Sequence, residues 1–235
     1  MIDPGLFASP KAELVIFDMD GLLVDTERIW GRVQAEVLDE IGVDVRPFLG
    51  QGLITGMRAD EAVALLRERL GFVGPNDDEL ARRIIEGVER AIPTEAKLLD
   101  GAEEALDFCD RNGLLVSLAS GSVEPVIDAV LNHFDLRKRF AAVVSAERVP
   151  LGKPHPAVLL LTAQEMSVDP IYCVVVEDAL NGCIAAKAAR MRAVAVPEPG
   201  TEDDQRWVIA DLVLDSLRQF ENPDVAALLG VIPAP

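Results

Sequence analysis

Two aspartates separated by one residue, Asp18 and Asp20, directly follow the apolar run Leu14–Phe17. A short apolar run predicts a strand buried on both faces, and strand side chains two residues apart point to the same side. Two close carboxylates are costly unless a cation lies between them or one keeps a proton. Such a carboxylate pair suits catalysis, because carboxylates bind Mg²⁺ and a carboxylate beside Mg²⁺ can attack a phosphorus atom. An acidic strand exit before Gly21 is also common in α/β proteins, so this motif alone leaves both interpretations open.

Polar residues follow three further predicted strands. The Ser120 hydroxyl and the amide of Gly121, at a predicted helix start, suit phosphate oxygens. Lys153 lies between a glycine and a proline, which would aim its ammonium at an anion. Glu177 and Asp178 add two carboxylates. Each group also has a simpler explanation, namely a helix cap, a solvated loop lysine and acidic residues at a helix start.

The composition is that of a globular protein, with 235 residues of which 50% are hydrophobic and 26% charged. This length suits one large domain or two unequal ones. No apolar run approaches the roughly 20 residues that a membrane span needs. The first residues, Met1–Gly5, contain no basic segment followed by an apolar core, so we expect no secretory signal.

The net charge of −18 argues against nucleic acid and anionic membranes as partners. It would also repel phosphorylated substrates, so a phosphate site needs its own local positive charge. The three cysteines form no close-spaced pair, which predicts reduced thiols and a cytoplasmic location.

The chain beyond about residue 100 alternates between predicted strands and helices, which indicates a parallel sheet covered by helices. The strands expected after Leu14–Phe17 are Leu114–Ser120, Ala141–Ser145, Ile171–Glu177, Arg192–Val196 and Leu212–Asp215. The helices expected between them are Gly101–Arg111, Val123–His133, Pro156–Met166 and Asn181–Ala189. Ser122 and Asp178 are predicted to cap the second and fourth of these helices.

The first crossover is much longer than the others. From Asp20 to Ser120 it spans 100 residues, whereas a strand–helix–strand unit needs only about 30. The surplus contains amphipathic patterns that predict helices over Glu27–Ile41, Asp60–Leu70 and Asp78–Ile92, with a return linker at Pro93–Leu99. We therefore predict a Rossmann-like α/β core from residues 1–25 and 96–235, with an α-helical cap domain inserted at residues 26–95.

The order of these groups along the chain resembles that of the motifs in the haloacid dehalogenase-like hydrolase superfamily. The groups are the pair Asp18 and Asp20, then Ser120, then Lys153, and then the pair Glu177 and Asp178. The resemblance covers residues 13–215, and the segment Asp18–Glu27 is its most specific motif. The helical insertion resembles the cap of the β-phosphoglucomutase-like subgroup. Within it, the segments Gly56–Asp60, Ala188–Pro197 and Asp204–Asp211 are similar to bacterial hexitol phosphatases and 2-deoxyglucose-6-phosphatases.

This resemblance implies a Mg²⁺-dependent phosphatase that hydrolyses small hexose or hexitol phosphates through an aspartyl-phosphate. Asp18 would be the nucleophile, and Asp20 would protonate the leaving oxygen and then deprotonate water. Mg²⁺ would be held by Asp18, the backbone carbonyl of Asp20 and Asp178. Glu177 would either bind the ion directly or contact one of its ligands.

The phosphoryl oxygens would be held by Ser120, Gly121 and Lys153. In the cap, Trp30 and Arg58 are the candidates to face the sugar, although an aromatic residue on an apolar helix face such as Trp30 is also a common core residue. The expected partner is a small phosphate ester, and we expect a monomer or weak homo-oligomer.

Three other functions stay open. A phosphosugar mutase of the β-phosphoglucomutase type has a cap histidine twelve residues after the nucleophile, where this chain has Trp30. A dehalogenase lacks the second aspartate of the first motif, which is present here as Asp20. A binding protein that has kept the fold without turnover would lack a motif residue, and none is missing.

Overall fold

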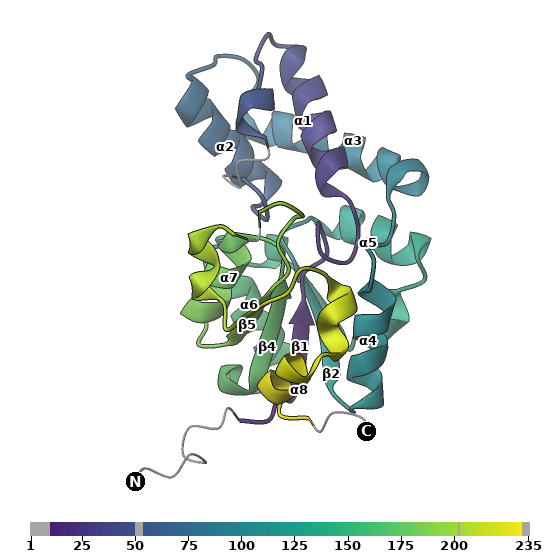
Figure 1. Ribbon diagram of the computed structural model, residues 1–235. Coiled ribbons are helices and arrows are strands. Elements are labelled where there is room, and N and C mark those ends of the chain that lie inside the picture. The colour runs from purple at the N-terminus through teal and green to yellow at the C-terminus, as the bar shows by residue number, and fades with distance from the viewer. Residues whose placement is uncertain (1–9, 50–53, 202, 232–235) are drawn as a thin grey trace.

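The computed structural model describes residues 10–49, 54–201 and 203–231; Met1–Gly5, considered above for a signal, lie outside these ranges. A six-stranded parallel sheet with the order β3-β2-β1-β4-β5-β6 forms its centre (Figure 1). The strands are β1 (Leu14–Phe17), β2 (Leu115–Ser120), β3 (Ala142–Ser145), β4 (Cys173–Glu177), β5 (Arg192–Ala195) and β6 (Leu212–Val213).

Helices cover both faces of the sheet. Alternate residues of β1 belong to two different apolar clusters, with Val15 and Phe17 in one and Leu14 and Ile16 in the other. The helices that follow the strands or close the chain are α4 (Ala102–Arg111), α5 (Glu124–His133), α6 (Ala157–Glu165), α7 (Leu180–Ala188) and α8 (Pro223–Leu229). The predicted α/β class with a parallel sheet is confirmed.

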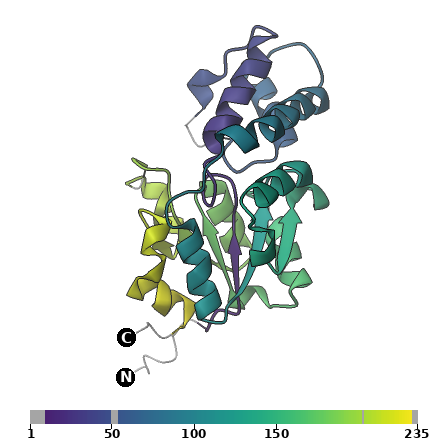
Figure 2. The same cartoon turned by 90° about the vertical axis from the view of Figure 1, so that its right-hand side faces the viewer.

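Three helices lie together beyond the carboxyl ends of the strands, as both views show (Figures 1 and 2). They are α1 (Glu27–Asp39), α2 (Ala59–Leu70) and α3 (Asp77–Glu95). Gly87 allows α3 to approach α1 closely, because a Cβ atom there would lie 2.6 Å from Val33. α3 continues past Pro93, so the prediction that the return linker begins at Pro93 is wrong. The proline lies in the last turn of the helix, where the Ala96 amide still donates a hydrogen bond to the Ile92 carbonyl.

The two chain segments that connect these helices to the sheet are hydrogen-bonded to each other. The Asp25 amide donates to the Lys97 carbonyl at 2.8 Å, and the Leu99 amide donates to the Leu23 carbonyl at 2.9 Å. The outgoing and returning segments therefore form one short paired connection beside the end of β1.

Two predicted helix caps are wrong. α5 has Val123 and α7 has Ala179 at the N-cap, and neither helix has a side-chain cap. Ser122 instead donates its hydroxyl hydrogen to Asp20, and Asp178 faces the carboxylates described below. Across the described ranges, no helix combines the length and apolar character needed to cross a membrane.

Candidate active site

Lys153 joins three neighbouring strands at the carboxyl edge of the sheet. Phe17 on β1 pairs with Leu118 on β2 and Val176 on β4, so the next residues, Asp18, Ala119 and Glu177, form one row. The Lys153 ammonium donates to all three, at 2.6 Å to Asp18 Oδ1, 2.9 Å to the Ala119 carbonyl and 2.5 Å to Glu177 Oε1. The strand register thus places two carboxylates and a carbonyl around one cation.

This ion cluster is almost completely enclosed. The side chains of Lys153 and Glu177 are 1% exposed, and that of Asp18 is 4% exposed. Burial raises the pKa of Asp18 to about 8, because desolvation outweighs the opposing attraction of Lys153. Burial alone would lower the pKa of Lys153, but Asp18 and Glu177 together raise it above its usual value. Lys153 therefore stays charged at neutral pH.

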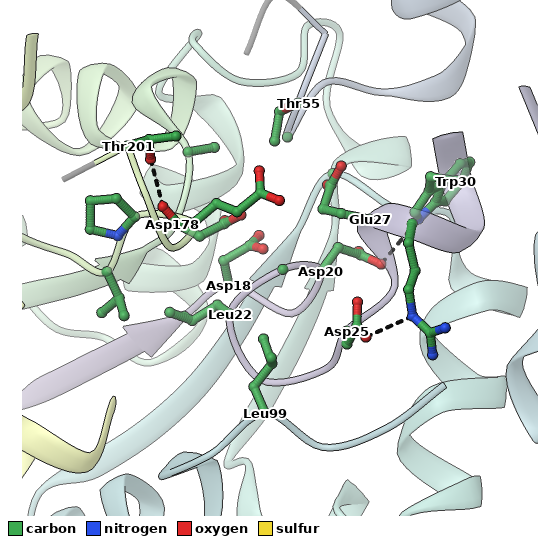
Figure 3. A pocket seen from close by; sticks show the side chains of 18 of the residues that line it. Asp18, Asp20, Leu22, Asp25, Glu27, Trp30, Thr55, Leu99, Asp178 and Thr201 are labelled. Atoms are coloured by element: carbon green, nitrogen blue, oxygen red, sulfur yellow. Dashed lines mark hydrogen bonds and ion pairs between the residues drawn. The ribbon is translucent and has the colours of Figure 1, made fainter. Parts of the chain in front are cut away.

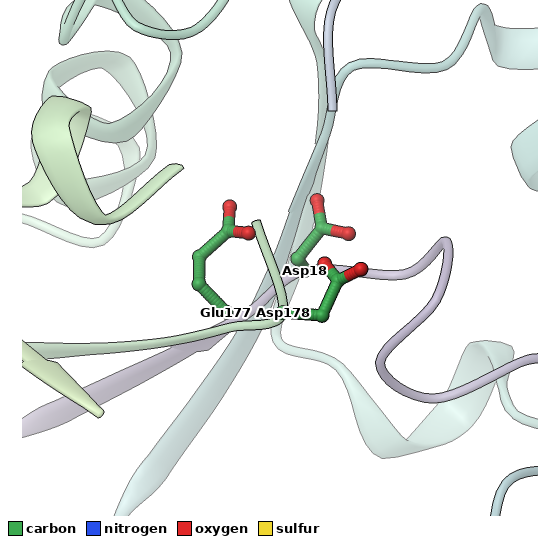
Figure 4. Close-up of side chains that lie close together, drawn as sticks. All are labelled: Asp18, Glu177 and Asp178. Carbon is green, nitrogen blue, oxygen red and sulfur yellow. The ribbon is translucent and has the colours of Figure 1, made fainter. Parts of the chain in front are cut away.

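Asp178 completes a group of three carboxylates with Asp18 and Glu177 (Figure 4), whose nearest oxygens all lie within 4.8 Å of one another. Burial, together with the charges of Glu177 and Asp18, raises the pKa of Asp178 well above its usual value. Gly21 makes room for Asp178, since a Cβ atom at this position would lie 2.3 Å from Asp178 Oδ2, and its φ of +79° suits glycine. Three crowded carboxylates, of which Asp18 and Asp178 have raised pKa values, fit a hard divalent cation such as Mg²⁺.

Glu177 is held mainly by protein groups. One of its oxygens accepts from Lys153, and the Ala179 amide approaches the other at 3.4 Å. Gly182, in the first turn of α7, provides space for the carboxylate, because a Cβ atom there would lie 1.9 Å from it. Glu177 is therefore placed to fix Lys153, and Asp18 and Asp178 remain as the carboxylates more open to a metal.

Asp20 accepts hydrogen bonds from four side chains. Its Oδ1 accepts from the Thr26 hydroxyl at 2.7 Å and the Trp30 indole N–H at 3.1 Å. Its Oδ2 accepts from the hydroxyls of Ser122 at 2.7 Å and Ser120 at 3.1 Å. One oxygen thus faces donors from the beginning of the helical insertion, and the other faces donors from the end of β2.

Thr26 and Ser122 were not singled out as site residues by sequence reasoning. Ser122 follows Ser120 by two residues, and its amide donates to the Ser120 hydroxyl at 2.9 Å. The sequence signal was the Ser-Gly-Ser segment around Gly121, where we assigned the second serine to a helix cap. Together these hydroxyls and amides form a compact set of donors suited to an oxyanion.

A cavity of about 900 Å³ opens between the sheet edge and the helical insertion (Figure 3). This is the size expected for a site that takes a small molecule. Its lining includes five of the residues predicted from the sequence, namely Asp18, Asp20, Trp30, Gly121 and Asp178. Lys153, Glu177 and Ser120 do not line the cavity: Lys153 is hydrogen-bonded to Asp18 and Glu177, and Ser120 is hydrogen-bonded to Asp20.

Arg58 does not line the cavity. Its guanidinium donates to Asp60 at 2.5 Å and 3.0 Å and to the Val149 carbonyl at 2.9 Å. Nearby, Glu61 accepts from the Gly152 amide at 3.0 Å. The start of α2 is thus attached to the loop that carries Lys153, and a contact between Arg58 and a sugar stays a prediction.

The fold and the site define a hydrolase of the α/β class with a carboxylate-rich centre. A profile of haloacid dehalogenase-like hydrolases matches residues 12–190. The chain is 42% identical over 210 residues to hexitol phosphatase B of Escherichia coli K12, covering 89% of this chain and 95% of that protein. The chain belongs to the haloacid dehalogenase-like hydrolase family, and it is a phosphatase that acts on phosphate monoesters.

Other comparisons agree with this family. Fructose-1-phosphate phosphatase YqaB of Escherichia coli K12 is 35% identical, with 77% of this chain and 95% of that protein covered. The crystal structure of CbbY from Rhodobacter sphaeroides in complex with phosphate has a TM-score of 0.77 at 26% identity, covering 89% of this chain and 96% of that one. A β-phosphoglucomutase from Clostridium difficile, with a TM-score of 0.81 at 24% identity and 93% and 97% coverage, shares the fold.

Proposed function

We propose that this protein is a Mg²⁺-dependent phosphatase of small sugar phosphates, hexose or hexitol phosphates, that acts through a phosphorylated Asp18. The observation that carries the proposal is the buried ion cluster of Asp18, Lys153 and Glu177, of which Asp18 lines the cavity together with Asp20. The sugar class is supported by the relatives, which include a hexitol phosphatase and a fructose-1-phosphate phosphatase.

Asp18 is the nucleophile in this proposal. Its carboxylate attacks phosphorus, the bond from phosphorus to the sugar oxygen breaks, and an aspartyl-phosphate forms. Lys153, bonded to Asp18 at 2.6 Å, compensates the charge of the nucleophile and attracts the phosphoryl group. Local positive charge is needed because the chain as a whole carries a net charge of −18.

Asp20 is the general acid and base. It gives a proton to the departing sugar oxygen and takes one from the water that hydrolyses the aspartyl-phosphate, so one carboxyl group serves both steps. Ser120 and Ser122 now donate to Asp20 Oδ2. In the substrate complex we assign these hydroxyls, with the amide of Gly121, to the phosphoryl oxygens, while Thr26 and Trp30 continue to orient Asp20.

Asp18 and Asp178 would hold Mg²⁺, with the Asp20 backbone carbonyl as the further ligand predicted from the family pattern. Glu177 supports the site by fixing Lys153. When bound, the ion screens the negative nucleophile from the negative phosphate and stabilises charge on the transferred group.

Residues 26–95 are assigned as the cap domain, which selects the sugar and excludes water. Trp30 lines the cavity from α1 and contacts Asp20, so it is placed between the cap and the acid. An indole N–H donates a hydrogen bond and accepts no proton. Trp30 therefore cannot act as the proton-shuttling cap histidine of the mutase alternative. The cytoplasmic location and the monomeric or weakly oligomeric state stay predictions.

The test is phosphate release from a panel of hexose, ketose and hexitol phosphates, with Mg²⁺ and with EDTA. The proposal expects hydrolysis of several sugar phosphates that is lost on chelation. It is contradicted by the absence of phosphate release from every sugar phosphate in Mg²⁺. Conversion of β-glucose 1-phosphate into glucose 6-phosphate faster than hydrolysis would favour the mutase instead.

A further inference from the structure

Glu27 is a cavity carboxyl that the mechanism above does not use. It is the first residue of α1, directly after Thr26, and it lines the cavity. Figure 3 shows its side chain pointing into the open space between Asp178 and Trp30, close to Asp20. A favourable helix dipole explains a carboxylate in a first helical turn, but it does not explain a carboxylate directed into a cavity.

The charges that act most strongly on Glu27 are all negative. Burial raises its pKa to about 8, and the charges that act most strongly on it, Asp20 and Asp18, also raise it. A carboxyl group that keeps its proton near neutral pH can both donate and accept hydrogen bonds. In the described chain this side chain forms no hydrogen bond with a protein group, so its donor and acceptor atoms are available to a molecule that occupies the cavity.

The position of Glu27 beside Asp20 limits which substrate atoms it can reach. Asp20 must contact the ester oxygen that leaves with the sugar. Glu27 lies close to Asp20 (Figure 3), so we expect it to face the atom attached one carbon beyond the ester carbon. We propose that Glu27 is a specificity-determining residue that binds the hydroxyl on the carbon next to the phosphorylated one. This inference rests on the proposed sugar phosphatase activity.

This assignment separates two classes of sugar phosphate. An acyclic hexitol phosphate carries a hydroxyl on the carbon beside its ester carbon, whereas an aldopyranose 6-phosphate carries the ring ether oxygen there. A hydroxyl can donate to and accept from Glu27, but an ether oxygen can only accept. Glu27 therefore favours hexitol phosphates over aldopyranose 6-phosphates.

The experiment compares two esters that differ in one hydroxyl, sorbitol 6-phosphate and 5-deoxysorbitol 6-phosphate. We expect Glu27→Ala to lower kcat/KM for the first ester about tenfold more than for the second, the size expected for one lost hydrogen bond. Glu27→Gln, which keeps donor and acceptor groups, should show a smaller difference. Melting temperatures of all variants establish that they are folded.

Glu36→Gln is the matched control, because Glu36 lies on the same helix with a side chain 60% exposed and paired to Arg32. It should change both efficiencies by less than about twofold, as expected for a surface ion pair. Equal losses for the two esters in Glu27→Ala would overturn the inference, as would a wild-type enzyme that prefers the deoxy ester. If wild type hydrolyses hexose 6-phosphates but rejects sorbitol 6-phosphate, the Glu27 inference alone fails. If it hydrolyses no sugar phosphate, the proposed function fails as well.

Discussion

The two aspartates of the first motif lie in contrasting surroundings although one residue separates them. Asp18 is buried beside a cation and two further carboxylates, and burial is the main cause of its raised pKa. Asp20 accepts hydrogen bonds from four neutral side chains. This contrast suits a division of work in which one carboxylate attacks phosphorus and the other handles protons.

Asp18→Asn should abolish turnover of every ester and leave the protein folded. An amide is a far weaker nucleophile than a carboxylate, and its size is nearly the same. Steady-state phosphate release, with circular dichroism as the folding control, measures this. A variant that keeps about a tenth of wild-type activity would exclude Asp18 as the nucleophile, because covalent catalysis contributes more than this factor.

At the residue scale, the sequence predicted which acidic and basic residues the structure brings together, since strand ends in a parallel sheet meet at one edge. It did not predict the partners of Asp20. Ser122 carries a local capping pattern, but its acceptor is 102 residues away in the chain. The direction of Glu27 likewise depends on how α1 sits over the sheet, which no local pattern contains.

At the element scale, α7 positions Glu177, because Gly182 in this helix lies directly against the Glu177 carboxylate. Gly182→Ala should displace Glu177 and with it Lys153, since the added Cβ would lie 1.9 Å from the carboxylate. We expect a destabilisation of about 1–3 kcal/mol, typical of overpacking, and a loss of efficiency for sugar and aryl phosphates alike. Thermal melting and the kinetics of both esters measure these effects.

Gly31→Ala is the matched control on stability, because Gly31 is also helical and, among the residues that the structure describes, its added Cβ would meet only Leu49 Cδ1, at 3.6 Å. Alanine should leave the melting temperature unchanged or raise it, since it favours helix more than glycine by about 1 kcal/mol. If Gly182→Ala melts like Gly31→Ala, the close approach of α7 is not a constraint on Glu177.

Arg58 connects α2 to the loop that carries Lys153 rather than facing the cavity. Arg58→Ala should therefore lower kcat/KM by similar factors for a sugar phosphate and for p-nitrophenyl phosphate, because both need Lys153 in place. The loss of a charged hydrogen bond suggests roughly ten- to a hundredfold. A loss confined to the sugar phosphate would instead support the sugar contact predicted from the sequence.

The elements themselves were largely predictable from periodicity and spacing. All six predicted strands are present, and β6 is shorter than expected at Leu212–Val213. The end of α3 was misplaced because Pro93 reads as a helix stop, although a proline in a last turn removes only one donor. The contact between the start of α2 and the loop around Gly152 depends on tertiary packing. The sequence alone therefore could not show that Arg58 binds this loop and does not line the cavity.

At the scale of the whole molecule, the carboxylates of the site couple stability to pH. The unfolded Asp18 carboxyl loses its proton near its ordinary pKa of 3.8, whereas the folded one keeps it up to about 8. Within this range the unfolded state binds fewer protons, so the stability contributed by Asp18 falls as pH rises, by at most about 1.4 kcal/mol per pH unit. Asp178, whose pKa is also raised, acts in the same direction.

Asp18→Asn removes this titration, and Lys153 remains charged and paired with Glu177. In metal-free protein, the melting temperature of the variant minus that of wild type should therefore increase between about pH 5 and pH 8. Mg²⁺ at the higher pH should then raise the melting temperature of wild type more than that of the variant. A difference that stays constant or shrinks with pH would contradict this account of the site.

The most direct test of the central claim, that Asp18 is phosphorylated and Asp20 serves both proton transfers, is the pre-steady-state reaction of Asp20→Asn with p-nitrophenyl phosphate in Mg²⁺. The aryl leaving group needs little protonation, whereas the attacking water still needs a base. We predict a burst of about one equivalent of p-nitrophenol per active site, with phosphate on the peptide that contains Asp18. A linear time course, together with an unmodified Asp18 peptide, would contradict the account.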